Sequence, residues 1–191
     1  MANLTFFVLQ TNLAGMIIER EKYKFTCMTL PKKPFQPVAF FLNILIPLIF
    51  GALGGFITRD SVKTWYPGLA KPSFNPPNWL FPPVWSTLFV LIGISSYLVW
   101  RKRAQIQHFS RTIAIYLIQL ILNLAWSFLF FYTHLIGAAL AEIVLLLAVI
   151  VINGVMFYKI DKVAGLLFIP YFLWVSFATL LTYNIFILNQ F

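Results

Sequence analysis

The stretch IGAALAEIVLLLAVIVINGVMFY (Ile136–Tyr158) decides the fold, because Glu142 is its one charged side chain. A helix rises about 1.5 Å per residue, so this stretch is long enough to cross a hydrocarbon core of roughly 30 Å. In lipid, every backbone amide must be bonded within the protein, and a helix does this inside one segment. The alternation with period 2 that is typical of barrel strands is missing. The stretch therefore predicts a transmembrane helix.

The composition of the whole chain agrees with a membrane protein. Of its 191 residues, 61% are hydrophobic and 10% are charged, and the mean hydropathy is +0.86. Soluble domains carry roughly 45–50% apolar and about 25% charged residues, so soluble and disordered proteins are excluded. Four further apolar segments accompany the first. We expect an all-α membrane protein of one domain, a bundle of five transmembrane helices at residues 38–58, 83–100, 112–132, 136–158 and 163–188.

Residues 1–37 differ from the rest and are interpreted as a polar leader that is flexible or lies on a surface. The alternative is an over-extended start, with Met28 as the first residue. The single cysteine, Cys27, allows no intrachain disulfide. Among the spans, Gly51 with Gly55 and Gly137 with Ala141 are pairs of small residues that permit close helix contacts, within the bundle or across a dimer.

The basic residues predict the topology. Because cytoplasmic loops carry an excess of Lys and Arg, we expect a cytosolic N-terminus and an external C-terminus. This clustering at span ends serves topology and lipid head groups rather than nucleic acid. The expected cytosolic set is Arg20, Lys22, Lys24, Lys32, Lys33, Arg101, Lys102, Arg103, Arg111, Lys159 and Lys162, against Arg59, Lys63 and Lys71 on the other side.

The long loop between the first two spans reads RDSVKTWYPGLAKPSFNPPNWLFP (Arg59–Pro82). Its aromatic residues argue against disorder, and its prolines lower the entropy cost of ordering. We expect a folded lid over one mouth of the bundle. The alternative is an aromatic belt, with Trp and Tyr at head-group depth.

Polar and aromatic side chains inside the spans are the candidate site residues. Gln119, Asn123 and Trp126 share one helix face, either as interhelical hydrogen bonds or as ligand contacts. The acid Glu142 is deep in a span and is expected to be protonated or paired with Asn123 or Gln119. Three aromatic residues have two interpretations: they line a cavity that accepts a flat ring, or they pack against one another as ordinary core side chains. They are Trp85, Phe89 and Trp174. Asn153 is expected to be a helix contact, and no metal site is expected at His108 or His134.

The run WYPGLAKPSFNPPNWLFPPVW (Trp65–Trp85) closely resembles the signature of the translocator protein family, also called tryptophan-rich sensory proteins or peripheral-type benzodiazepine receptors. Further motifs match in the right order, and together they cover about Ile44–Tyr183. They are Gly54-Gly55-Phe56, the run from Gln119 through Asn123 to Trp126, Pro170-Tyr171-Phe172-Leu173-Trp174 and Phe177-Ala178-Thr179.

This resemblance implies a five-helix bundle, usually a homodimer, with a pocket under the first long loop. The family's pocket binds porphyrins and isoquinoline or benzodiazepine-type drugs. The resemblance implies no required cofactor, with a porphyrin such as protoporphyrin IX or haem as the ligand. The ligand-binding residues expected from matching positions are Tyr66, Trp85, Phe89, Gln119, Asn123, Trp126, Glu142, Trp174 and Ala178.

Three functions follow from the resemblance. The first is tetrapyrrole binding that regulates porphyrin level or stress signalling, and the second is degradation of protoporphyrin with light and oxygen by Trp85 and Trp174. The third, porphyrin or sterol transport, usually goes with internal repeats that five unequal spans lack. Eukaryotic members bind cholesterol, but no Lys or Arg follows Leu181 and Tyr183 here, so we expect no sterol at that position. A bacterial-type member in a cell membrane fits better.

Overall fold

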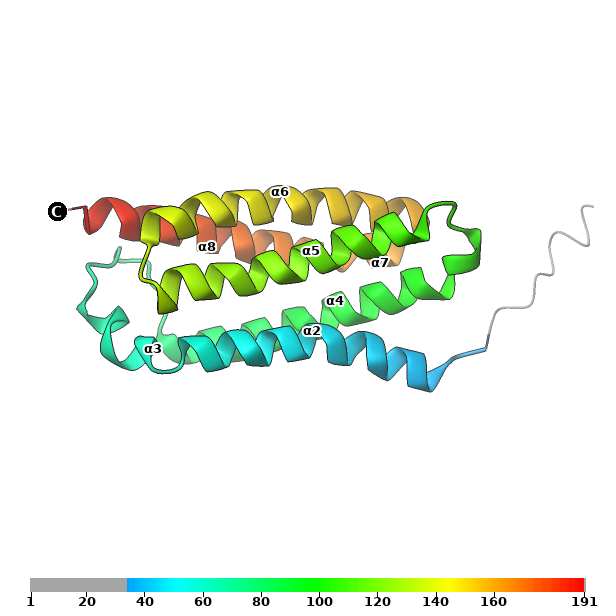
Figure 1. The fold of residues 1–191 in the computed structure, drawn as a ribbon, viewed down its shortest axis with the longest axis horizontal. Coiled ribbons are helices and arrows are strands. Elements are labelled where there is room, and N and C mark those ends of the chain that lie inside the picture. The colour runs from blue at the N-terminus through cyan, green and yellow to red at the C-terminus, as the bar shows by residue number, and fades with distance from the viewer. Residues whose placement is uncertain (1–33, 191) are drawn as a thin grey trace, which may run out of the picture. The chain divides into compact units, whose positions relative to one another are not determined.

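The computed structural model describes residues 34–190, so most of the predicted leader and the alternative start at Met28 lie outside the described residues. Within the unit Gln36–Phe191, five helical spans are long and apolar enough to cross a membrane. They run alongside one another (Figure 1). The prediction of a five-helix membrane bundle is confirmed. The spans are Pro37–Thr58, Asn78–Arg101, Phe109–Tyr132, Ile136–Ile160 and Lys162–Leu188.

Proline sets where several of these helices begin. Helix α2 (Pro37–Thr58), α4 (Phe81–Arg101) and α8 (Ile169–Leu188) each carry a proline at their first positions. Proline is tolerated there because those amides have no partner inside the helix. The fifth span, expected over residues 163–188, runs from Lys162 to Leu188. It is divided into α7 (Lys162–Leu166) and α8, because Pro170 begins a new helix.

The third span also departs from a single regular helix. Helix α5 (Phe109–Ser127) continues as a π-helical turn, η4 (Phe128–Tyr132), before α6 (Ile136–Ile160) begins. Such turns are rare and occur frequently at functional sites. The chain reverses at His134, whose φ of 58° is a left-handed conformation. This end of the bundle also holds the loop between α2 and α4, with the short helices α3 (Ser61–Thr64), η1 (Tyr66–Gly68) and η2 (Asn78–Leu80).

Helices α2 and α4 meet closely at one point and diverge at another. A Cβ added to Gly93 would lie 2.6 Å from the Ile44 Cα, so the two backbones touch there. At Gly51 an added Cβ would lie 2.5 Å from the Phe89 ring, whereas at Gly55 nothing lies within 4 Å. Gly51 is thus a contact inside the bundle. The space beside Gly55 shows that the two helices have separated toward the loop.

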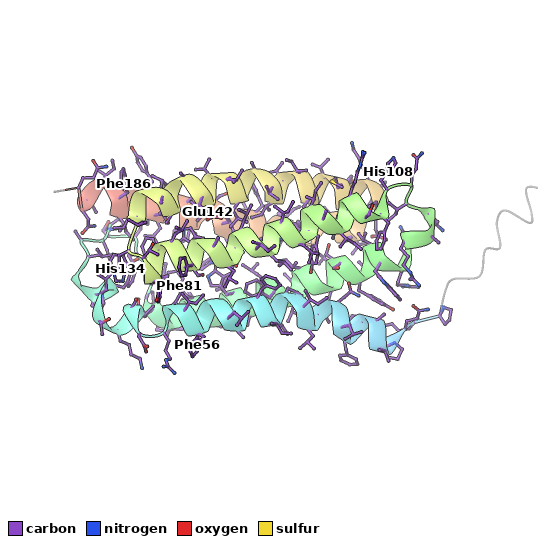
Figure 2. The ribbon with its side chains drawn as sticks, in the orientation of Figure 1. Phe56, Phe81, His108, His134, Glu142 and Phe186 are labelled. Atoms are coloured by element: carbon purple, nitrogen blue, oxygen red, sulfur yellow. The ribbon has the colours of Figure 1, made fainter. Side chains whose placement is uncertain are left out.

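The opposite end of the bundle is closed by polar contacts. Lys102 Nζ lies 2.8 Å from Asp161 Oδ2 and donates to the Ile160 carbonyl at 3.0 Å. Asp161 Oδ1 accepts from the amides of Val163 and Ala164, at 2.9 and 3.1 Å, and so caps α7. Figure 2 shows His108 at this end and His134 at the end with the loop.

Candidate ligand-binding cavity

A cavity of about 530 Å³ lies beneath the loop that follows α2. Its size falls within the roughly 300–1,000 Å³ of small-molecule sites. Four of the five spans and the loop supply its walls, and α6 does not. Seven of the nine expected ligand residues line it, namely Tyr66, Trp85, Phe89, Asn123, Trp126, Trp174 and Ala178.

The residues from Arg59 to Leu80, here called the lid, contact the bundle at several places. Trp65 stacks on His134, with ring centroids 4.0 Å apart, and Ser61 Oγ donates to the Phe131 carbonyl. Farther along, the Asn189 side chain bonds both backbone groups of Ala70, accepting from its amide at 3.0 Å and donating to its carbonyl at 2.9 Å. The lid is therefore attached to the α5–α6 connection and to the end of α8.

Tyr66 is the buried residue among the lid residues that line the cavity. Its side chain is 5% exposed, and its hydroxyl donates to Asn75 Oδ1 at 2.8 Å. Burial raises the pKa of Tyr66, and the bond to Asn75 opposes this only in part, so the phenol stays neutral at pH 7. Trp79 behaves differently, because it is 71% exposed, as an aromatic belt would require. The lid interpretation holds for Tyr66, and the belt interpretation describes Trp79.

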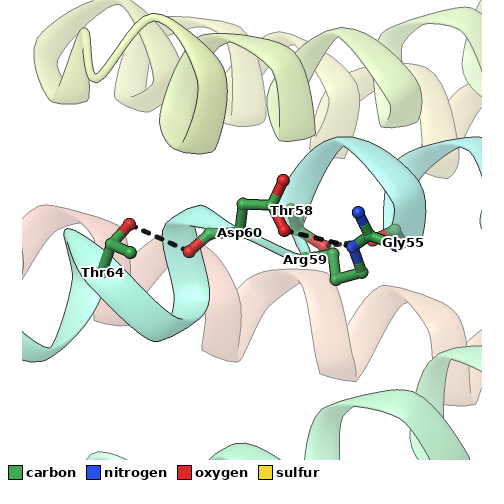
Figure 3. Close-up of polar contacts among 5 residues, drawn as sticks. All are labelled: Gly55, Thr58, Arg59, Asp60 and Thr64. Atoms are coloured by element: carbon green, nitrogen blue, oxygen red, sulfur yellow. Dashed lines mark hydrogen bonds and ion pairs between the residues drawn. The ribbon is translucent and has the colours of Figure 1, made fainter.

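The corner between α2 and the lid places a cation at the cavity rim. Arg59 lines the cavity and lies 3.1 Å from Asp60 Oδ1, with both side chains mostly exposed. Hydroxyl groups fix the backbone around this pair, as Figure 3 shows. Thr58 Oγ1 donates to the Gly55 carbonyl at 3.1 Å, and Thr64 Oγ1 donates to the Asp60 carbonyl at 2.9 Å. An exposed pair of this kind is weak and can exchange partners.

Aromatic rings form the cavity walls. Trp85 stacks on Phe89 with centroids 5.7 Å apart, and Trp126 stacks on Phe130 at 5.2 Å. The indole N–H groups of Trp126 and Trp174 are buried and have no hydrogen-bond partner within the described part of the chain. Because an unmet buried donor costs about 1–3 kcal/mol, these two groups favour a ligand that brings acceptors.

Gln119 and Glu142 are the two expected ligand residues that do not line the cavity. Gln119 Oε1 accepts from Asn153 Nδ2 at 2.7 Å, so it joins α5 to α6, and Asn153 is a helix contact as expected. Asn123 donates to the Tyr171 hydroxyl at 3.1 Å. Of the two alternatives expected for Glu142, protonation and pairing with Asn123 or Gln119, the structure shows no pairing, because neither amide is bonded to its carboxylate. The Glu142 carboxylate, on α6 in Figure 2, has no bonded partner among residues 34–190.

Several cavity residues were missed from the sequence. Phe130 and Phe131 enter the wall because the π-helical turn η4 shifts their direction, and no sequence pattern signals such a turn. Gly54, where an added Cβ would lie 3.3 Å from Ser127 Oγ, could have been found from its glycine motif. Residues that both line the cavity and are exposed mark its open side between α2 and α4; they include Ala52, Gly55, Pro82 and Ser86.

Comparison with known proteins identifies the family. A TspO/MBR family model matches residues 43–188. The tryptophan-rich protein TspO of Archaeoglobus fulgidus is 42% identical over 147 residues, which are 77% of this chain and 94% of that protein. The translocator protein of Sus scrofa is 36% identical over 144 residues, 73% of this chain and 85% of that one. The matched range includes the lid and the aromatic cavity beneath it, and the chain belongs to the TspO/MBR family of integral membrane proteins.

Proposed function

We propose that the chain binds a tetrapyrrole in the cavity under the lid and regulates porphyrin level or stress signalling. The observation that carries this proposal is the wall of stacked aromatic rings around about 530 Å³. A porphyrin presents a broad flat π face, for which offset stacking on Trp85 and its neighbours is favourable. The resemblance of the lid and helix motifs to porphyrin-binding relatives points the same way.

The polar groups of the cavity suit the carboxylates of such a ligand. A porphyrin with propionate side chains carries two anions on one edge of the ring. Arg59 at the rim can exchange the Asp60 carboxylate for a propionate, because both partners of the present pair are solvent-exposed. The unpaired N–H groups of Trp126 and Trp174 are buried in the cavity wall, and a small rotation of either indole brings its donor to the ligand.

The test is a titration of the purified protein with protoporphyrin IX in the dark, followed by porphyrin absorbance. Replacing Trp126 and Trp174 together by Phe keeps ring area and removes both donors, so we expect at least tenfold weaker binding. Trp79→Phe is the matched control and should bind as the wild type does, because Trp79 is 71% exposed and outside the cavity. Unchanged affinity in the double variant, or equal losses in the control, would contradict the proposed site.

A second candidate is oxidative degradation of bound protoporphyrin by light and dioxygen. The favouring observation is that Trp85 and Trp174, the two indoles assigned to this reaction from sequence, both line the cavity. Illumination of the complex in air should then yield open-chain products that mass spectrometry detects. Trp85→Phe with Trp174→Phe should stop this turnover. Photodegradation at the wild-type rate in that variant would leave binding as the function.

The orientation in the membrane is a further part of the proposal. We propose a cell membrane with the N-terminus in the cytosol, which puts the lid outside. Among the described residues, Arg101, Lys102, Arg103, Arg111, Lys159 and Lys162 belong to the connections opposite the lid. A reporter fused after Phe191 should be external, and a cytosolic reporter would reverse the assignment.

A further inference from the structure

A second hollow lies at the end of the bundle away from the lid, between α2, α4 and α5. Its volume is about 290 Å³. We call it the lower groove. Four of its apolar side chains are 39–53% exposed, so it opens on the outer face of the bundle, where the acyl chains of the bilayer are. These four are Leu42 and Ile46 on α2 and Ile113 and Leu117 on α5.

Polar groups interrupt the apolar wall of the lower groove. Ser96 Oγ donates to Asn43 Oδ1 at 2.7 Å, and Asn43 Nδ2 donates to the Ala39 carbonyl at 2.8 Å. Tyr116 is 5% exposed, and its hydroxyl is buried beside Ser96 without a hydrogen bond of acceptable geometry in the described chain. An unpaired hydroxyl in an apolar setting is costly, so the groove favours an occupant with an acceptor.

Positive charge lies at the solvent end of the lower groove. Trp100 lines the groove, and the Arg103 guanidinium stacks over its ring at 3.7 Å from the centroid while donating to its carbonyl at 3.2 Å. Arg103 therefore lies where a bilayer places its phosphates.

The three features occur in the order of the parts of one phospholipid. Phe109 and Tyr116 are seven residues apart, about 10 Å along α5. Helical side chains lean toward the helix N-terminus, which brings the Tyr116 hydroxyl back toward this end of the groove. A phosphate beside Arg103 therefore leaves an ester carbonyl near the Tyr116 hydroxyl, and the acyl chain below it runs along the apolar wall.

We propose that the lower groove binds one anionic diacyl phospholipid, such as phosphatidylglycerol. Arg103 holds its phosphate, Tyr116 donates to an ester carbonyl, and one acyl chain fills the groove. The net charge of the head group decides the preference, because a choline head group adds a cation beside Arg103. This site is separate from the cavity under the lid and does not depend on its ligand.

Native mass spectrometry of the delipidated full chain in detergent micelles tests the proposal. Phosphatidylglycerol and phosphatidylcholine with identical acyl chains are the probes. We expect one tightly bound phosphatidylglycerol, held at least tenfold more tightly than phosphatidylcholine. Arg103→Gln should reduce this preference to about threefold or less. Tyr116→Phe should weaken both lipids about threefold to tenfold, because the lost hydrogen bond is common to both.

Matched variants separate a specific site from a general effect. Ile113→Trp fills the groove from an exposed position and should remove the tightly bound lipid. Tyr132→Phe, at the lid end and 67% exposed, and Lys63→Gln, in the lid, should bind lipid as the wild type does. Equal binding of the two lipids by the wild type, or retention of the bound lipid in Ile113→Trp, would overturn the proposal. So would a dimer in which a second copy, and no lipid, covers the groove.

Discussion

The cavity under the lid and the contact between Lys102 and Asp161 at the opposite end of the bundle hold their polar groups in opposite ways. At the lid end, the indole N–H groups of Trp126 and Trp174 are buried without partners, and Arg59 is held only by an exposed pair. At the other end, Lys102 and Asp161 bond each other and also the backbone of the α6–α7 connection. Unmet polar groups around an enclosed volume indicate a binding site, whereas completed ones indicate a structural clamp.

The contacts between α2 and α4 also differ along the bundle. The backbones of α2 and α4 touch at Gly93 and are apart beside Gly55. Close packing therefore holds the middle of the bundle together and leaves room under the lid. Stability and ligand binding therefore depend on different parts of the same pair of helices.

The largest expected effect comes from Gly93→Ala. The new Cβ would lie 2.6 Å from the Ile44 Cα, so the backbones must separate, at a cost of about 1–3 kcal/mol in the free energy of unfolding. Gly55→Ala is the matched control and should change that free energy by less than about 0.5 kcal/mol. Denaturant unfolding in mixed micelles measures both. Equal losses in the two variants would remove the distinction between the closed and open parts of the α2–α4 contact.

A smaller effect is expected at the contact between Lys102 and Asp161, here called the clamp. Asp161→Ala removes the cap of α7 and should lower the free energy of unfolding at pH 7 by about 1 kcal/mol. Asp161→Asn retains a capping oxygen and should lose less than half of this, because the pair with Lys102 is partly exposed. An equal free energy of unfolding in wild type and Asp161→Ala would contradict the role of the clamp.

The contribution of the clamp to the free energy of unfolding also depends on pH, and the charge of Asp161 gives the direction. Burial alone would raise the pKa of Asp161, but the bond and charge of Lys102 and the amides of Ala164 and Val163 together hold it below its usual range. Its contribution to stability is therefore complete above the unfolded pKa of about 3.9 and is lost as the pH falls through the lower folded value. The difference in the free energy of unfolding between wild type and Asp161→Ala should therefore become smaller only at acidic pH.

The smallest effect is expected at the cavity rim. Arg59→Gln should weaken protoporphyrin IX binding about threefold, because a charge contact at an exposed site contributes less than about 1 kcal/mol. Lys63→Gln, in the lid but outside the cavity lining, should leave the affinity unchanged. Raising the salt concentration should reduce the difference between Arg59→Gln and the wild type. A loss that is the same in both variants would mean that net charge, and not Arg59, attracts the ligand.

Much of this architecture was predictable from sequence. The apolar segments predict the spans, and seven of the nine residues expected from the family resemblance line the cavity. Helical periodicity placed Gln119 and Asn123 on one face, but their partners depend on which helix is adjacent, so the Gln119–Asn153 bond could not be read from spacing. The π-helical turn η4 depends on packing between spans, which local patterns do not encode.

The central claim is that the lid retains a tetrapyrrole in the aromatic cavity, and its dissociation rate tests this most directly. Trp65→Ala together with Asn189→Ala removes the stack on His134 and both bonds to Ala70 while leaving the cavity walls intact. Stopped-flow displacement of protoporphyrin IX should show dissociation at least tenfold faster than in the wild type, with association changed less than threefold. A dissociation rate equal to that of the wild type would contradict the account.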